Sequence, residues 1–453
     1  MTRRPAFTPM APTPTELRIL AQVERRFDEM VDLTARLVRI NTVNPYSGDS
    51  SAGIEKAGQE LMRKELKAAG ARVEVVPVPE DIYRQCGVLG PRDRSWEGRY
   101  NVVGRFELPA RTKPGRRTSQ GGQPVSSAAR RRGKTLILNC HIDTVGTEGY
   151  EGDPFEGGVR EGRLWGRGTS DSKGNLAIGL GAIKALLSVD ASLTGEILLE
   201  SVVDEECNGT GAGTLACLKA GVVGDACLAL DGDAHCPYRG CDGVVTPEIE
   251  VVGRSGHSAY GAVNAIEKLT VVKGAIDQFR ERRLAMKPPR PVSLGLIRGG
   301  TLPAIVPQKA VMQYNVNYGL EEVVPPPLFP GAEIMRQFEA VVGEAAGKDP
   351  WLREHPPRIT WLKDAPPYRI PDDAPIVRLA EEASAEVLGR VQPGGIVAWG
   401  DAAHFWNQAR IPVVGMGGAN AGTAHSSCEY VELKGMLTAA KALALASYRF
   451  LAG

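Results

Sequence analysis

The sequence predicts an α/β fold: a mostly parallel sheet with helices on both faces, into which a smaller α+β domain is inserted. Three observations predict it. Up to residue 242, short apolar runs typical of buried parallel strands alternate with segments of helical periodicity. From residue 243 to 363 the patterns follow the order strand, helix, strand, strand, helix, strand, which is that of a ferredoxin-like, split βαβ unit. The first pattern then returns over residues 364–453, so residues 1–242 and 364–453 are predicted to form one domain around the insertion.

The first elements are two helices followed by two strands. Apolar residues recur at helical spacing over residues 14–40. A second helix is predicted over residues 53–69, with Gly70 as the residue that ends it. Alternating side chains predict strands over residues 72–78 and 101–107.

A basic segment over residues 109–134 interrupts this order. It is rich in Pro, Gly, Ser and Gln and has eight Lys or Arg but no acidic residue. This composition favours a solvated, flexible insertion between two strands. A nucleic-acid patch or a targeting signal is the alternative, for which one short basic cluster is weak support.

Three buried strands follow, and each leads into polar residues. Apolar runs over residues 135–139, 195–203 and 227–230 predict the strands, and a helix is predicted over residues 175–187. In open α/β sheets, sites lie outside the carboxyl ends of the strands. The residues at these ends are His141 and Asp143, Glu205 and Glu206, and Asp231.

The inserted domain is predicted to contain four strands and two helices. The predicted strands cover residues 247–252, 292–297, 310–318 and 358–362, and the helices cover residues 262–283 and 333–347.

Composition excludes several classes of protein. The net charge of +1 gives no electrostatic reason for binding nucleic acid or an anionic membrane. No run of about 18 apolar residues occurs, which argues against a membrane span. The start of the chain lacks the apolar segment of a signal peptide, and the eight cysteines include no Cys-x-x-Cys pair. These features predict a cytoplasmic protein with reduced thiols. The glycines of residues 208–213 are not spaced as in a dinucleotide-binding loop, so no such cofactor is expected.

Five residues of metal-ligating type stand in these strand ends and glycine-rich turns. Two imidazoles and three carboxylates suit a pair of zinc-like ions when one carboxylate bridges them, and cobalt or manganese would fit the same set. Two ions about 3.5–4 Å apart form a hydrolytic site. The sequence therefore predicts a metal-dependent hydrolase of amide bonds, with the ligands His141, Asp171, Glu206, Asp231 and His425.

Two further acids are expected to act on protons. Asp143 follows His141 in a His-x-Asp pattern, and it can accept a hydrogen bond from the imidazole nitrogen that does not bind metal. Glu205 is adjacent to Glu206, so one acid can bind metal while the other deprotonates a water about 3 Å away. Simpler interpretations stay open for each motif: a polar pair at a strand end, a helix N-cap at Asp171, and a solvated acidic loop.

Taken together, these motifs resemble those of the metallopeptidase and deacylase family that contains acetylornithine deacetylase, succinyl-diaminopimelate desuccinylase, aminoacylase and the bacterial glutamate carboxypeptidase. The resemblance covers nearly the whole chain apart from the basic segment and the first dozen residues. The motifs that carry it lie at residues 140–145, 166–171, 204–206, 225–231, 256–259 and 423–431.

The resemblance implies a role for each site residue. His141 and Asp231 would bind one metal ion and Glu206 and His425 the other, with Asp171 bridging them. Asp231 is the Asp variant of a ligand that other members supply as Glu.

The resemblance also implies the catalytic groups. Glu205 would deprotonate the metal-bound water and then protonate the leaving amine, and Asp143 would support His141. His257 would steady the tetrahedral oxyanion, often across the interface of a homodimer that forms through the inserted domain.

The sequence departs from the family where a substrate carboxylate is usually bound. Relatives place an Asn after a Gly-Gly and an Arg on the next strand, but here Gly300 precedes Thr301 and no Arg occurs between residues 311 and 318. A guanidinium is the usual partner of a carboxylate, and Arg298 is the nearest substitute. The expected substrate is an N-acyl amide of a small molecule such as an N-acyl amino acid. The alternatives are a dipeptidase or carboxypeptidase with the same metals, an amidase that acts on an uncharged amide, and a catalytically silent binding protein.

Overall fold

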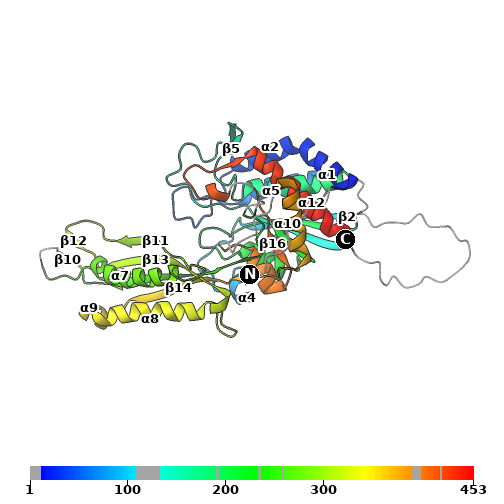
Figure 1. Cartoon of the computed structure of the whole chain (residues 1–453). Coiled ribbons are helices and arrows are strands. Elements are labelled where there is room, and N and C mark those ends of the chain that lie inside the picture. The colour runs from blue at the N-terminus through cyan, green and yellow to red at the C-terminus, as the bar shows by residue number, and fades with distance from the viewer. Residues whose placement is uncertain are drawn as a thin grey trace, which may run out of the picture.

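The computed structural model describes residues 12–108, 133–189, 193–232, 236–257, 260–389, 399–418 and 421–453. A larger domain carries α1 and α12 near the two ends of the chain, and a smaller, elongated domain extends from it (Figure 1). Residues 109–132 of the basic segment lie outside the described residues, so the flexible insertion stays a prediction.

A six-stranded sheet forms the centre of the larger domain, in the order β1-β2-β6-β3-β7-β16. The last four strands of this order run parallel, whereas β1 and β2 join the edge in antiparallel pairs. The predicted mostly parallel sheet is confirmed, with a mixed edge. The strands are β1 (Arg72–Pro77), β2 (Tyr100–Leu108), β3 (Lys134–His141), β6 (Gly195–Val202), β7 (Ala226–Ala229) and β16 (Val413–Gly415).

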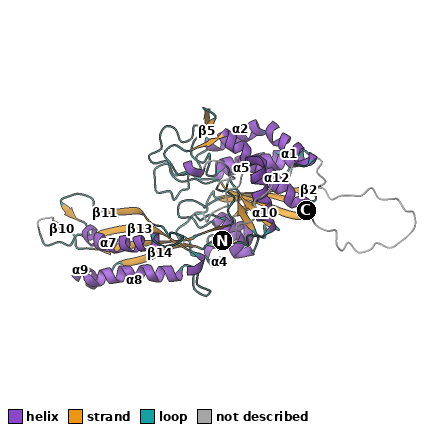
Figure 2. Ribbon diagram, viewed as in Figure 1, coloured by secondary structure: helices purple, strands orange, loops and turns teal. Residues whose placement is uncertain are grey.

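Helices cover both faces of this sheet, as Figure 2 shows, which explains why β3 and β6 are apolar on both sides. One layer packs together on one face and comprises α1 (Pro14–Arg25), α2 (Phe27–Val38), α5 (Lys173–Leu187), α10 (Pro375–Leu388) and α12 (Leu433–Ala452). The other helices are α3 (Lys56–Ala68), α4 (Ile82–Gln85), α6 (Ala212–Lys219) and α11 (Ala402–Ala409). Among the described residues, no helix combines the length and apolar character that a membrane crossing requires.

The single helix predicted over residues 14–40 is two helices. Thr13 and Glu16 form a capping box that starts α1. The backbone leaves helical geometry at Arg26, and α2 starts directly afterwards. α1 packs against α12, and α2 packs against α5. Helical periodicity continues across the break, so the spacing of apolar residues does not reveal it.

Small sheets hold the loops at the carboxyl edge of the central sheet. β17 (Tyr430–Glu432) pairs with β5 (Arg163–Trp165), which pairs with β4 (Gly158–Arg160). This sheet ties the loop before α5 to the C-terminal loop that contains the 3-10 turn η2 (Ala421–Thr423). β8 (Gly240–Cys241) pairs with β15 (Tyr368–Arg369) where the chain enters and leaves the smaller domain.

The inserted domain is a four-stranded antiparallel sheet with two long helices on one face. The strand order is β11-β13-β9-β14, the order of a ferredoxin-like unit, which confirms the prediction. A separate apolar core joins the sheet to the helices. The elements are β9 (Gly243–Val252), α7 (Ala265–Leu284), β11 (Val292–Gly299), β13 (Lys309–Tyr318), η1 (Leu320–Glu322), α8 (Ala332–Lys348), α9 (Pro350–Glu354) and β14 (Arg358–Ala365). A short pair, β10 (Gly256–His257) with β12 (Ile305–Val306), lies at the far tip (Figure 1).

Candidate metal centre

The five predicted ligands meet at the carboxyl edge of the central sheet. They come from five separate chain segments: His141 ends β3, Glu206 follows β6, Asp231 follows β7, Asp171 precedes α5 and His425 precedes β17. Parallel strands that end at one edge bring these residues together although they are far apart in the sequence.

Asp171 lies between the two histidines. Its Oδ1 is 3.0 Å from Nε2 of His141, and its Oδ2 is 3.2 Å from Nε2 of His425. Glu206 Oε1 is 3.0 Å from the same nitrogen of His425. One carboxylate therefore presents each of its oxygens to a different imidazole, which is the arrangement that a bridging ligand needs.

Two compact groups of ligand atoms share Asp171. His141, Asp171 and Asp231 form one, and Asp171, Glu206 and His425 form the other; within each, the ligand atoms lie within 4.8 Å of one another. Imidazole nitrogen and carboxylate oxygen are the donors that zinc and related ions take. The chemistry and spacing of the donors thus fit two divalent ions.

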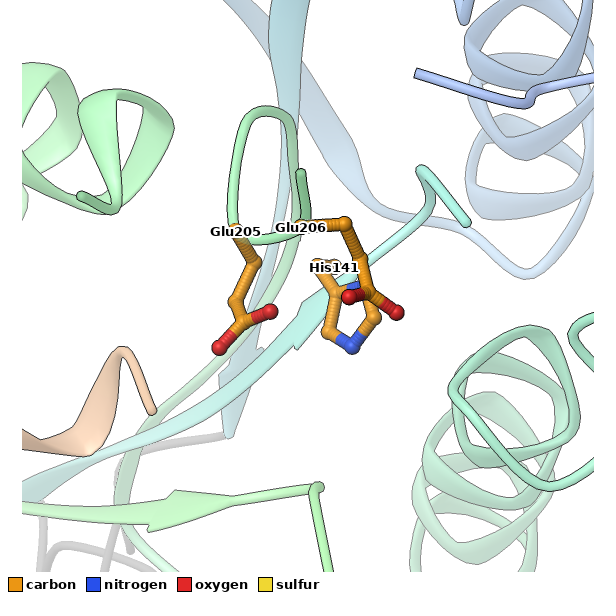
Figure 3. A group of neighbouring side chains, drawn as sticks. All are labelled: His141, Glu205 and Glu206. Atoms are coloured by element: carbon orange, nitrogen blue, oxygen red, sulfur yellow. The ribbon is translucent and has the colours of Figure 1, made fainter. Parts of the chain in front are cut away.

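Glu205 stands beside these groups and belongs to a third close set with His141 and Glu206. In Figure 3 the side chains of Glu205 and Glu206 leave the same turn toward the His141 ring, and their carboxylates lie apart. Glu206 Oε1 contacts His425, whereas the Glu205 carboxylate accepts no hydrogen bond from any described residue. Burial raises the pKa of Glu205 well above its ordinary value. This carboxylate is therefore placed to exchange protons beside the ligands.

Opposite charges hold the ligands together. Hydrogen bonds that the His425 imidazole donates to the carboxylates of Asp171 and Glu206 raise the pKa of His425 to about 11. Burial alone would lower the pKa of His141, but Asp171 together with the nearby Glu205 and Asp143 outweighs burial and raises the pKa well above its usual value. For Asp171, burial opposes ionisation, yet the two imidazoles bring the pKa below its usual range. Burial raises the pKa of Glu206 to about 7. Protons held in this way occupy donor atoms that a metal ion can take over.

The backbone of Asp143, rather than its carboxylate, contacts the His141 ring. Nδ1 of His141 lies 2.9 Å from the backbone oxygen of Asp143, whereas the closer carboxylate oxygen is 3.8 Å away. The sequence predicted that the Asp143 carboxylate would accept from the His141 ring. The backbone oxygen of Asp143 takes this place, because the carboxylate accepts hydrogen bonds from other donors. The backbone N–H groups of Glu205 and Glu206 donate to it, and Nδ2 of Asn44 donates at 2.8 Å. Asp143 thus fixes His141 and the two glutamates at once.

The turn that carries Glu205 and Glu206 is backbone-strained. Asp204, Cys207 and Asn208 have φ angles of 69°, 57° and 60°, in the left-handed region that non-glycine residues rarely adopt. Strain of this kind persists only where the surroundings hold it, and it clusters at functional sites.

A buried network of charges holds this turn, and no sequence pattern predicts it. Asp204 accepts from Arg99 Nη2 at 3.1 Å and from the hydroxyl of Tyr83 at 2.5 Å, and it pairs with Arg94 at 3.3 Å. Arg94 also donates to the backbone oxygen of Cys207. The contacts join residues more than a hundred positions apart, so no local sequence pattern predicts them. The loop that packs over the turn can be located in the sequence only by the Asn–Pro pair at residues 44–45, which breaks the preceding helix.

A second buried acid holds the Asp171 loop. The Glu429 carboxylate accepts from the backbone N–H groups of Ser170 and Asp171 at 3.0 and 3.1 Å. Nη1 of Arg167 donates to its other oxygen at 2.8 Å. Glu429 belongs to a motif used for the resemblance, but its contacts were not predicted.

His257 and Arg298 lie away from the ligands in the inserted domain. His257 is on β10, at the tip farthest from the central sheet (Figure 1). Arg298 is exposed on β11 and lines a groove with Glu248 and Gln313. Within one chain, neither residue contributes to the cluster.

Known protein sequences are similar to this chain over most of its length. A family model described as peptidase family M20/M25/M40 matches residues 137–449. The N-formyl-4-amino-5-aminomethyl-2-methylpyrimidine deformylase of Halalkalibacterium halodurans is 29% identical over 352 residues, which cover 68% of this chain and 78% of that protein. An acetylornithine deacetylase of Myxococcus xanthus is 26% identical over 335 residues, which cover 70% of this chain and 80% of that protein.

Solved structures share the fold. Human carnosine dipeptidase 1 aligns with a TM-score of 0.67 over 98% of this chain and 100% of its own, at 16% identity. The dipeptidase Dug1p of Saccharomyces cerevisiae aligns with a TM-score of 0.69 over 96% of this chain and 98% of its own, also at 16% identity.

Proposed function

This chain belongs to peptidase family M20/M25/M40 and is a metal-dependent hydrolase of amide bonds. We propose that it is a deacylase that binds two divalent ions. The substrate is proposed to be a small molecule that carries an acyl group on an amine nitrogen. The bond is then a linear amide other than a peptide bond.

One observation carries the dinuclear proposal: the two oxygens of Asp171 face two different histidines. Asp171 would bridge the ions. His141 and Asp231 would complete one site, and Glu206 and His425 the other. Zinc is the ion that this donor set favours first, with cobalt and manganese as alternatives.

The chemistry divides between the ions and the protein. When bound, two such ions polarise an amide carbonyl and lower the pKa of a water molecule. The Glu205 carboxylate takes the proton of the attacking water and delivers it to the leaving amine nitrogen. Its lack of another hydrogen-bond donor among the described residues leaves it available for both transfers. The Asp143 carboxylate keeps Glu205 and Glu206 in place through their backbone N–H groups.

His257 is proposed to act from a second copy of the chain. Its position at the tip of the inserted domain keeps it from the cluster of its own chain, which fits a homodimer in which each tip reaches the partner's cluster. There its imidazole would donate to the developing oxyanion.

The nature of the relatives supports deacylation. A deformylase and a deacetylase both match more than two thirds of this chain. The dipeptidases among the solved structures are 16% identical, so they support the fold and not the substrate. A short acyl group, formyl or acetyl, on a primary amine is therefore the proposed scissile unit.

The test is hydrolysis of a panel by the metal-stripped protein reloaded with Zn²⁺ or Co²⁺. The panel contains formyl and acetyl amines, N-acyl amino acids and dipeptides. Metal-dependent release of formate or acetate supports the proposal. Turnover restricted to dipeptides would replace it with a dipeptidase, and no turnover of any amide after reloading would reject hydrolysis of this class of bond.

A further inference from the structure

A β-bulge redirects one lysine of the inserted domain toward the candidate metal centre. On β14, Trp361 pairs with Pro247 of β9, and Lys363 pairs with the next residue, Thr246, so Leu362 is one extra residue. Alternation would otherwise place Lys363 on the same face as Trp361, which packs against the helices. The bulge turns Lys363 to the opposite face, and bulges next to active sites commonly redirect a side chain in this way.

The redirected side chain crosses from the inserted domain to the catalytic domain. Lys363 is only 8% exposed, and its Nζ donates to the backbone oxygen of Gly209 at 3.4 Å. Gly209 belongs to the turn that begins at Asp204 and carries Glu205 and Glu206. The ammonium therefore lies against the turn that holds the general base.

Unlike its cationic neighbours, Lys363 has no carboxylate partner among the described residues. Arg99 pairs with Glu55 and Asp204, and Arg94 pairs with Asp204. Of the three hydrogen-bond donors on the Lys363 ammonium, one long bond to Gly209 is the contact that the described residues supply. Burying a charge without an opposite charge is costly, and a buried cation of this kind beside a functional site is a candidate for contact with an anionic ligand.

The surroundings place this free charge on the Glu205 side of the cluster. Nζ lies 5.7 Å from the centre of the Trp399 ring. The neighbouring Gly400 packs so closely that a Cβ there would be 3.1 Å from Asp231 Oδ2 and 3.7 Å from Glu205 Oε1. Burial lowers the pKa of Lys363, and of the surrounding charges Glu205 opposes this most strongly. No ion pair joins Lys363 to Glu205 among the described residues, so the two charges face the same region without touching.

We propose that Lys363 determines specificity by binding a carboxylate on the amine side of the substrate, an inference that rests on the proposed deacylase function. Glu205 returns its proton to the leaving amine, so the amine half of the substrate lies next to Glu205 and within the region that Lys363 faces. A carboxylate there would supply the ion-pair partner that Lys363 lacks among the described residues. The Trp399 ring adds an apolar surface beside it. The substrate class is thus an N-acylated amino acid rather than a neutral amine.

The experiment compares matched substrates that differ in one charge. N-acetylglycine and N-acetylglycinamide have the same shape on the amine side, and an N-succinyl amine with its N-butyryl analogue provides the same comparison on the acyl side. The variants are Lys363→Met and the control Lys309→Met, a lysine exposed on the same sheet. Thermal unfolding of each variant checks that it is folded.

The wild type is expected to prefer the carboxylate over the carboxamide at least about 30-fold in kcat/KM, which is the effect of losing one partner of a buried charge pair. Lys363→Met should remove this preference by raising KM for the carboxylate much more than KM for the carboxamide. Lys309→Met should behave like the wild type. Calorimetric titration of the metal-loaded protein with glycine should show binding to the wild type and its loss in Lys363→Met.

Three results would overturn the inference. They are the absence of a preference in the wild type, a preference confined to the acyl side, and an equal loss of kcat for both substrates with a shifted pH profile, which would mean that Lys363 only positions Glu205. If the deacylase proposal fails, none of the amides is cleaved. The calorimetric titration with glycine still measures whether Lys363 binds a carboxylate, so the two failures can be distinguished.

Discussion

Glu205 and Glu206 are neighbours with different surroundings, and this difference assigns their roles. Glu206 contacts His425, while Glu205 keeps its carboxylate free of hydrogen-bond donors among the described residues. Glu205→Gln removes the proton acceptor but keeps the shape of the side chain. We expect kcat to fall by about 10²–10⁴-fold, the usual share of a general base, with metal content unchanged. Steady-state kinetics of the metal-loaded variant measures the fall in kcat. An unchanged kcat would show that Glu205 is not the general base.

A buried acid outside the site predicts how stability depends on pH. Burial raises the pKa of Glu200 to about 8, from an ordinary value of 4.5. Between these values the folded protein holds a proton that the unfolded chain has lost. The free energy of unfolding therefore falls as pH rises from about 4.5 to about 8, by up to about 1.4 kcal/mol per pH unit.

Glu200→Gln imitates the protonated acid and should remove this slope. We expect the variant to equal or exceed the wild type in stability at pH 8 and to lose that advantage toward pH 5. Urea denaturation at several pH values measures the difference. Glu107→Gln, an exposed position on the neighbouring strand β2, is the control and should follow the wild type. Parallel curves for Glu200→Gln and the wild type would mean that Glu200 is ionised in the folded protein.

At the scale of single residues, the sequence identified the residues that meet at the cluster better than the residues that hold them in place. His141, Asp171 and Asp231 stand at strand ends and turns that local patterns identify. Local patterns do not identify the residues that hold them in place, because these act through contacts between distant parts of the chain. Asn44 donates to Asp143, 99 positions away, and Arg167 donates to Glu429, 262 positions away. Only the folded chain brings such pairs together.

The loops at the carboxyl edge are the elements that build the site. Glu429 accepts four hydrogen bonds from the segment that carries Arg167, Ser170 and Asp171, and so fixes the proposed bridging residue. In Glu429→Gln an amide N–H₂ replaces one acceptor and faces these donors, and the buried Arg167 loses its counter-charge. We expect metal affinity to fall about 10–100-fold, the usual effect of losing a group that orients a ligand.

Competition with a metal-binding dye measures this affinity. The exposed Glu432→Gln on the adjacent strand β17 is the control and should keep wild-type affinity. Wild-type affinity in Glu429→Gln would show that the Asp171 loop holds its shape without this carboxylate.

Some helices and strands can be predicted from the periodicity of apolar residues alone, and others cannot. Runs of apolar residues predict buried strands such as β3, and the order of strands and helices along the chain predicts the antiparallel sheet of the inserted domain. Breaks that keep the helical phase, as at Arg26, and a one-residue bulge, as at Leu362, leave no mark in the pattern. Each depends on the neighbour that the element packs against.

At the scale of the whole molecule, the role proposed for His257 requires a dimer, because β10, which carries it, lies at the far tip of the inserted domain (Figure 1). We expect light scattering to give twice the chain mass. His257→Ala alone should lose about 10²–10³-fold in kcat, as for the loss of one oxyanion donor.

Mixing His257→Ala with Glu205→Gln tests whether His257 acts across the interface. Random exchange makes half of the dimers mixed, and each mixed dimer has one complete site, so about a quarter of the wild-type activity should return. An active monomer, or no recovery after exchange, would contradict the contribution of His257 to a partner's site.

The proposed pair of metal ions that share Asp171 is best tested by the metal content of the protein. Mass spectrometry of the metals retained after dialysis should give two ions per chain for the wild type and for Glu205→Gln. Asp171→Asn, which weakens the bridge to both sites, should retain one ion or none. One ion in the wild type, or two in Asp171→Asn with unchanged affinity, would contradict the account.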